Sequence, residues 1–154
     1  MKRTVMILCA LLLSCAAASA QNIVLGQRAP ELRVAEWLEG REPAPAPLTY
    51  IEFYHSSNPR CEEALDRLAA LSKQLGKRLR VVVLTREATE KIAPALAGRI
   101  APRTGVGLDP QGKLFTAFGV SYVPFGVLVD AKGRALWMGN TLQLTQKLIE
   151  DSAK

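Results

Sequence analysis

Apolar positions follow two different periods in the first half of the chain. Residues 48–54 (LTYIEFY) and 79–84 (LRVVVL) are rich in β-branched and aromatic side chains, as strands are. The second run is apolar almost throughout, which is typical of a parallel strand covered on both faces. Between the two runs, apolar residues recur at helical spacing. The pattern therefore predicts a strand, a helix and a second strand.

The predicted helix has a well-defined start and end. Asn58 suits the capping position, and Pro59 suits the first helical residue because its missing N–H is not needed there. Gly76 is a typical residue to follow the last turn. The apolar positions of this helix are Ala64, Leu65, Leu68, Leu71 and Leu75.

Shorter elements are expected in the second half of the chain. They are a helix at 89–96, a strand at 106–108, a helix at 113–118, strands at 125–129 and 135–138 joined by a turn, and an amphipathic helix at 142–149. Strands that alternate with helices in this way predict an α/β fold with a central mixed sheet. The last two strands supply its antiparallel edge.

The N-terminus has the features of an export signal. A basic start, an uncharged apolar run at 4–13 and the small residues of 18–20 predict a signal peptide over residues 1–20. The apolar run is too short for a membrane span. We therefore expect residues 21–154 to form one exported domain in the periplasm or cell envelope.

A second interpretation of the N-terminus stays open. Leu12-Leu13-Ser14-Cys15 is similar to a lipobox, and cleavage before Cys15 would leave a lipid-modified cysteine that tethers the protein to a membrane. Leu13 fits that pattern poorly, so we rank a lipoprotein second.

Charge argues against a nucleic-acid partner. The net charge is +6 for the whole chain and +4 once Lys2 and Arg3 are removed with the signal peptide. The basic residues are spread along the chain and alternate with acidic ones, as in residues 62–78. No dense basic stripe with interleaved aromatic residues is present.

Cysteine usage is more informative. Of three cysteines, Cys9 and Cys15 fall within the predicted signal peptide, so the exported domain keeps only Cys61. It cannot form an internal disulfide. Cys61 is therefore a free thiol, an intermolecular partner, or an inert buried side chain.

Four segments resemble one known family. Residues 51–61 (IEFYHSSNPRC) resemble the active-site stretch of thioredoxin-like proteins, in which a strand with an acid leads to C-x-x-C at a helix start. Residues 118–130 resemble the segment that carries the family's cis-proline. Residues 29–32 and 133–139 are similar to parts of exported TlpA-like and ResA-like redoxins. The resemblance implies a thioredoxin-like three-layer α/β/α sandwich and a relationship to thiol-disulfide oxidoreductases.

The departure from the family is at the first cysteine of C-x-x-C. Asn58 stands there, and asparagine cannot form the attacking thiolate, so the usual dithiol cycle cannot run within this domain. Asn58 either caps the helix, which we favour, or contacts substrate.

Cys61 remains at the resolving position. The helix start and Arg60 favour a reactive thiolate, whereas burial would make Cys61 a small core residue.

The resemblance implies roles for further residues. Glu52 matches a buried acid that handles the proton of the resolving cysteine, although strand alternation alone allows it to face solvent. Pro124 matches the cis-proline and, with Tyr122 and Val123, would border a groove that presents backbone to an extended substrate. His55 is close enough in sequence to activate Cys61, but a loop histidine facing water is the commoner case.

Three functions are compatible with these residues. The first is a single-thiol redox role for Cys61 on protein thiols or disulfides in the cell envelope. The second is a catalytically inactive module that binds an extended peptide or protein. A single-cysteine peroxidase ranks last, because Tyr54 and Asn58 stand where peroxiredoxins have proline and threonine. No metal-ligand spacing is present, and no cofactor is expected.

Overall fold

The computed structural model describes residues 22–154. The predicted signal peptide at 1–20 and the lipobox residue Cys15 lie outside the described residues. Within residues 22–154, every helix is too short or too polar to cross a bilayer.

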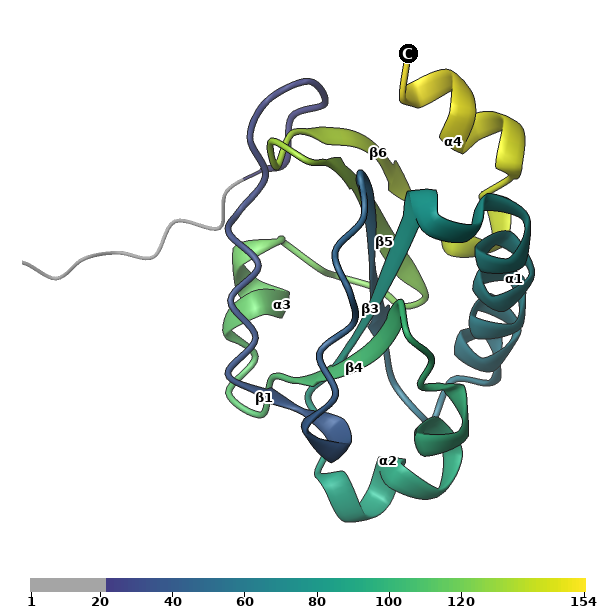
Figure 1. Ribbon diagram of the computed structural model, residues 1–154. Helices are drawn as coiled ribbons and strands as arrows, with labels where there is room; N and C mark the ends of the chain where they lie inside the picture. The colour runs from purple at the N-terminus through teal and green to yellow at the C-terminus, as the bar shows by residue number, and fades with distance from the viewer. Residues whose placement is uncertain (1–21) are drawn as a thin grey trace, which may run out of the picture.

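One mixed sheet organises the described chain (Figure 1). Its strands in chain order are β1 (Glu36–Trp37), β2 (Leu48–Tyr54), β3 (Leu79–Thr85), β4 (Thr104–Leu108), β5 (Phe125–Asp130) and β6 (Ala135–Gly139). Their spatial order is β1-β4-β3-β2-β5-β6. β2 pairs in parallel with β3 on one side and antiparallel with β5 on the other. The central mixed sheet and its antiparallel hairpin edge are therefore confirmed.

Helices cover both faces of the sheet. They are α1 (Pro59–Leu75), α2 (Thr89–Leu96), α3 (Lys113–Ala117) and α4 (Gln146–Ser152). Figure 1 shows α1 and α4 on one side of the sheet and α3 on the other. Alternation along β2 matches these layers, because Tyr50 and Tyr54 belong to the core beneath α1, whereas Ile51 and Phe53 belong to the core beneath α3. The architecture is a three-layer α/β/α sandwich.

Helix α1 forms as its sequence predicts. The Asn58 side chain caps its first turn, Pro59 is its first residue, and Gly76 follows its last residue with φ of 54°. The apolar positions expected along it are all buried, which fixes the helix on the sheet.

The C-terminal helix differs from the prediction of 142–149. A short 3₁₀ turn, η4 (Thr141–Gln143), comes first, and Leu144 is then extended with ψ of 133°. Thr145 caps the helix by accepting from the backbone N–H of Leu148 at 3.1 Å, so α4 begins at Gln146. Local capping by Thr145 outweighs the apolar periodicity that extended the prediction toward the N-terminus.

Candidate functional site

Two loops meet at one end of the central strands. One leads from β2 into α1, and the other leads into β5. Because β2 and β5 are antiparallel, with Phe53 opposite Phe125, the end of one strand lies beside the start of the other. This register brings Asn58 to Val123, and the peptide bond from Val123 to Pro124 is cis.

The Asn58 side chain uses both ends of its amide. Its Oδ1 accepts from the backbone N–H of Arg60 at 3.0 Å, which caps α1 as the sequence predicts. Its Nδ2 donates to the backbone carbonyl of Val123 at 2.8 Å. Asn58 therefore joins the start of the helix to the loop before Pro124.

Cys61 lies one turn further along α1 and is fully buried. Its backbone N–H donates to the carbonyl of Asn58 at 2.9 Å, within the first turn. Burial raises the pKa of the Cys61 thiol, and the nearby carboxylates of Glu62 and Glu87 raise it further, while a backbone hydrogen bond from His55 opposes them. The side chain packs in the core beneath α1 as a neutral thiol.

Glu52 is also fully buried, on the same side of the sheet as Tyr50 and Tyr54. Its Oε2 accepts from the Thr141 hydroxyl, and Thr141 Oγ1 lies 2.8 Å from the Tyr50 hydroxyl. Thr141 has a single hydroxyl proton and gives it to Glu52, so Tyr50 donates to Thr141. Glu52 Oε1 is buried without a hydrogen-bond partner.

Burial sets the ionisation of Glu52. Loss of water raises the pKa of this carboxyl well above its ordinary value, and the hydrogen bond from Thr141 only partly offsets the effect. A neutral acid is far less costly than a buried unpaired carboxylate. Glu52 therefore places a protonated carboxyl on the face of the sheet against which Cys61 of α1 packs.

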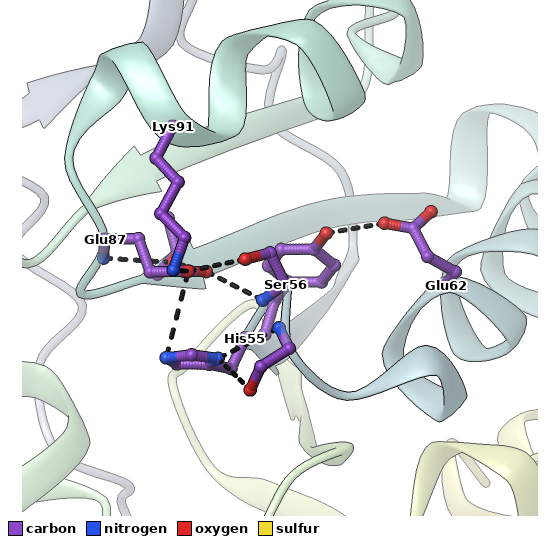
Figure 2. Close-up of polar contacts among 8 residues, drawn as sticks. His55, Ser56, Glu62, Glu87 and Lys91 are labelled. Carbon is purple, nitrogen blue, oxygen red and sulfur yellow. Dashed lines mark hydrogen bonds and ion pairs between the residues drawn. The ribbon is translucent and has the colours of Figure 1, made fainter.

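A second acid, Glu87, organises the loop before α1 (Figure 2). It accepts from the backbone N–H of Ser56 at 2.7 Å and from the Ser56 hydroxyl at 2.6 Å. Lys91 Nζ lies 2.6 Å from Glu87 Oε1, and His55 Nε2 lies 3.8 Å from the same oxygen. Burial alone would raise the pKa of Glu87, but its bonds to Lys91 and Ser56 and the nearby His55 lower it to about 2.

His55 is held within this loop. Its Nδ1 accepts from the backbone N–H of Ser57 at 3.2 Å and lies 2.8 Å from the Ser57 hydroxyl. The ring proton is therefore on Nε2, which faces Glu87. Through residues 22–154, no hydrogen bond links the His55 ring to Cys61. The ring is partly exposed, in keeping with the favoured expectation of a loop histidine.

A third polar chain fixes α1 to the segment after α2. The Tyr54 hydroxyl donates to Glu62 Oε1 at 2.5 Å, and Arg99 donates to Glu62 Oε2 at 2.9 Å. Arg99 also pairs with Asp66 at 2.9 Å. Burial and the hydrogen bond to Glu62 raise the pKa of Tyr54, so its hydroxyl stays protonated.

The remaining predicted site residues lie around the same end of the sheet. Tyr122 is half exposed and packs edge-on against Phe125, with ring centres 5.3 Å apart. Pro124 is buried and Val123 partly buried. Arg60 is exposed. It contacts the site through its backbone N–H, which donates a hydrogen bond to Asn58 Oδ1.

Sequence reasoning missed several of these residues. Glu87 lies two residues after the end of β3, whose last residue Thr85 pairs with Tyr54 at the end of β2. Parallel neighbours end at the same edge of a sheet, so this position was the available signal. Thr141 gave no such signal, because it meets Glu52 from 89 residues away. Within residues 22–154, no three His, Cys, Asp or Glu side chains gather closely enough to hold a metal ion.

Solved structures share this architecture. A candidate thiol:disulfide interchange protein DsbE from Chlorobium tepidum is 17% identical, with a TM-score of 0.69 over 86% of this chain and 100% of that one. StoA from Bacillus subtilis is 16% identical, with a TM-score of 0.61 over 83% and 100%. The exposed lipoprotein thioredoxin Etrx1 from Streptococcus pneumoniae is 19% identical, with a TM-score of 0.57 over 69% and 82%.

These likenesses confirm the thioredoxin-like fold that the sequence resemblance predicted. No protein-family model matches the chain, and no curated protein matches it in sequence. Three-dimensional similarity at this level of identity shows the fold alone, and the chemistry depends on this chain's own residues. Those residues provide a buried neutral thiol, a buried neutral acid, and a helix start tied to the neighbouring loop.

Proposed function

We propose that this chain is an exported thioredoxin-fold protein that binds extended polypeptide beside Tyr122 and does not exchange disulfides. The observation that carries the proposal is the Asn58 amide, which occupies the position of the attacking cysteine and bonds to both Arg60 and Val123. The residue that would attack a disulfide is thus replaced by one that fixes two loops in place.

The state of Cys61 supports the same conclusion. A thiol must be ionised and reachable to attack a disulfide, whereas Cys61 is fully buried and burial raises its pKa. Its position beneath Asn58 suits a resolving cysteine, but Asn58 cannot present a mixed disulfide to it. Packing in the core accounts for Cys61 without a reaction.

The surface beside Pro124 supports polypeptide binding. Tyr122 is 51% exposed and is braced edge-on by Phe125, so an aromatic side chain is presented in a fixed orientation. The bond from Asn58 to Val123 holds the adjoining loop. A fixed loop loses little conformational entropy when it binds a partner, which favours affinity.

Export belongs to the same proposal. The sequence pattern of residues 1–20 favours a cleaved signal peptide, with lipid attachment at Cys15 as the alternative. Residues 21–154 would then act as one domain in the periplasm or cell envelope. The description of Etrx1 as an exposed lipoprotein thioredoxin supports an extracytoplasmic location for a protein of this fold.

The test measures thiol reactivity and polypeptide binding on the same protein. Alkylation of Cys61 by iodoacetamide, followed by intact mass from pH 6 to 9, should be at least ~100-fold slower in the folded protein than in the urea-unfolded chain, because the thiol is buried. Binding of a reduced, carboxymethylated and therefore unfolded protein should weaken in Tyr122→Ser. Leu148→Ser, which removes another exposed apolar side chain on α4, should bind as the unchanged protein does.

The position of Glu52 supports a second candidate function, the single-thiol redox role of Cys61. Glu52 lies on the same face of the sheet as Cys61, and its raised pKa moves its titration toward neutrality, which suits proton exchange with a thiol. In that role the Cys61 sulfur would attack a small disulfide, whose S–S bond breaks as a mixed disulfide forms. The protonated Glu52 would give its proton to the leaving thiolate, which departs as a thiol, and would take up the Cys61 proton in return. Folded-state alkylation faster than that of the unfolded chain would select this function over the binding module.

A further inference from the structure

A cavity of about 440 Å³ lies on the α1 face of the sheet, away from Asn58 and Pro124. Its walls come from α1, from β3, and from the segment 98–104 that links α2 to β4. Figure 1 shows that this segment runs beside the lower half of the sheet. A cavity of this size falls within the range of about 300–1,000 Å³ that is typical of small-molecule sites.

The deep walls of the cavity are apolar for a simple geometric reason. Leu65 and Leu68 lie three residues apart on one face of α1, and Val81 and Val83 lie two residues apart on one face of β3. All four side chains are buried in the core. They offer a surface suited to a hydrocarbon chain and to no polar group.

Two polar side chains of the cavity each have an unsatisfied atom. Ser72 Oγ and Arg103 Nε are shielded from water and have no hydrogen-bond partner. Arg103 and Lys73 form no ion pair within residues 22–154, whereas the neighbouring Arg99 is held by two acids. A buried donor without a partner is costly, so Ser72 Oγ and Arg103 Nε favour binding of an acceptor that the described chain does not supply.

We propose that this cavity binds a fatty-acid anion, with the alkyl chain against the leucine and valine walls and the carboxylate at Arg103. An arginine fork matches a carboxylate in shape and charge, Lys73 adds a second positive charge, and the Ser72 hydroxyl can donate a hydrogen bond. Neither Cys61 nor Tyr122 lines this cavity, so fatty-acid binding here would be independent of the proposed polypeptide-binding role.

Isothermal titration calorimetry of residues 21–154 with decanoate, below its micelle concentration, tests the site. One decanoate should bind per chain. Arg103→Met should weaken binding at least ~10-fold, because it keeps the length of the side chain and removes its charge. Ala69→Phe, at a cavity-lining position of α1, should abolish it by filling the space. Lys113→Met changes the net charge equally but lies on α3, and should bind normally.

Three comparisons would overturn the proposal. Acetate binding as well as decanoate would mean a surface ion site with no use for the apolar walls. Decyltrimethylammonium binding equally well would mean that Arg103 does not select the anion. Absence of decanoate binding, in a sample with an intact circular dichroism spectrum, would mean that water fills the cavity. Ser72→Ala provides a gentler second variant, which should weaken binding several-fold without altering the fold.

Discussion

The Asn58 side-chain amide donates to the backbone carbonyl of Val123 at 2.8 Å, across 65 positions of sequence. The same side chain caps α1 through Arg60. One residue thus fixes the helix start relative to the loop that precedes Pro124. The sequence resemblance aligns this position with the first cysteine of C-x-x-C, and here the side chain serves a structural role.

Substitutions at Asn58 separate its two bonds. Asn58→Ala removes both the cap and the bond to Val123 and should lower the free energy of unfolding by about 2 kcal/mol. Asn58→Asp keeps a capping oxygen but has no donor for the Val123 carbonyl, and should cost about 1 kcal/mol. Urea unfolding at pH 7 measures both values. If Asn58→Asp is as stable as the unchanged protein, the bond to Val123 contributes nothing.

Restoring the first cysteine tests the correspondence with C-x-x-C. Asn58→Cys places a second thiol three residues before Cys61 at the start of α1, where a disulfide between the two can form and exchange. We expect this variant to reduce insulin disulfides in the presence of dithiothreitol at a rate above that of dithiothreitol alone. The double variant Asn58→Cys/Cys61→Ser should lack this catalysis. A folded Asn58→Cys protein with no activity would contradict the correspondence.

Burial of Glu52 gives stability a definite dependence on pH. Its pKa is raised in the folded protein, so the folded state keeps a proton that the unfolded chain loses above about pH 4.5. The free energy of unfolding should therefore fall as the pH rises from that value toward the folded pKa, by at most about 1.4 kcal/mol per pH unit. Glu52→Gln cannot ionise and should remove this slope, as measured by urea unfolding between pH 4.5 and 8.

Glu87 provides the matched comparison, because its pKa is shifted in the opposite direction, to about 2. Its contribution to stability is complete above the unfolded pKa of about 4.5 and is lost as the pH falls toward 2. Glu87→Gln should therefore flatten the acid side of the curve and leave the slope above pH 4.5 in place. A slope above pH 4.5 that persists in Glu52→Gln would assign it to another group.

The Tyr50 side chain lies so close to Gly126 that no side chain fits at that position. A Cβ at Gly126 would overlap the hydroxyl and ring of Tyr50, which is fully buried and bonded to Thr141. Gly126→Ala should lower the free energy of unfolding by about 1–3 kcal/mol. Gly98→Ala is the matched control, because its added methyl meets no atom within 4 Å. Equal effects at the two positions would rule out the overlap with Tyr50 as the cause.

The sequence by itself determined the elements whose signals are local. The capping residue Asn58, the helical spacing that follows it and the apolar run of β3 predicted α1 and β3 to within a residue, because caps and side-chain periodicity depend on near neighbours. The order of the elements and the four matching segments predicted the thioredoxin-like fold. The start of α4 was predicted too early, since the capping role of Thr145 was not recognised.

Only the tertiary structure decided the state of the site. Alternation along β2 could not say which face Glu52 points to, and its burial beside Thr141 depends on a segment 89 residues away. Cys61 could have been a reactive thiol at a helix start, but packing removes it from water and raises its pKa. Solvation and long-range hydrogen bonds set these properties, and both exist only once distant segments have been brought together.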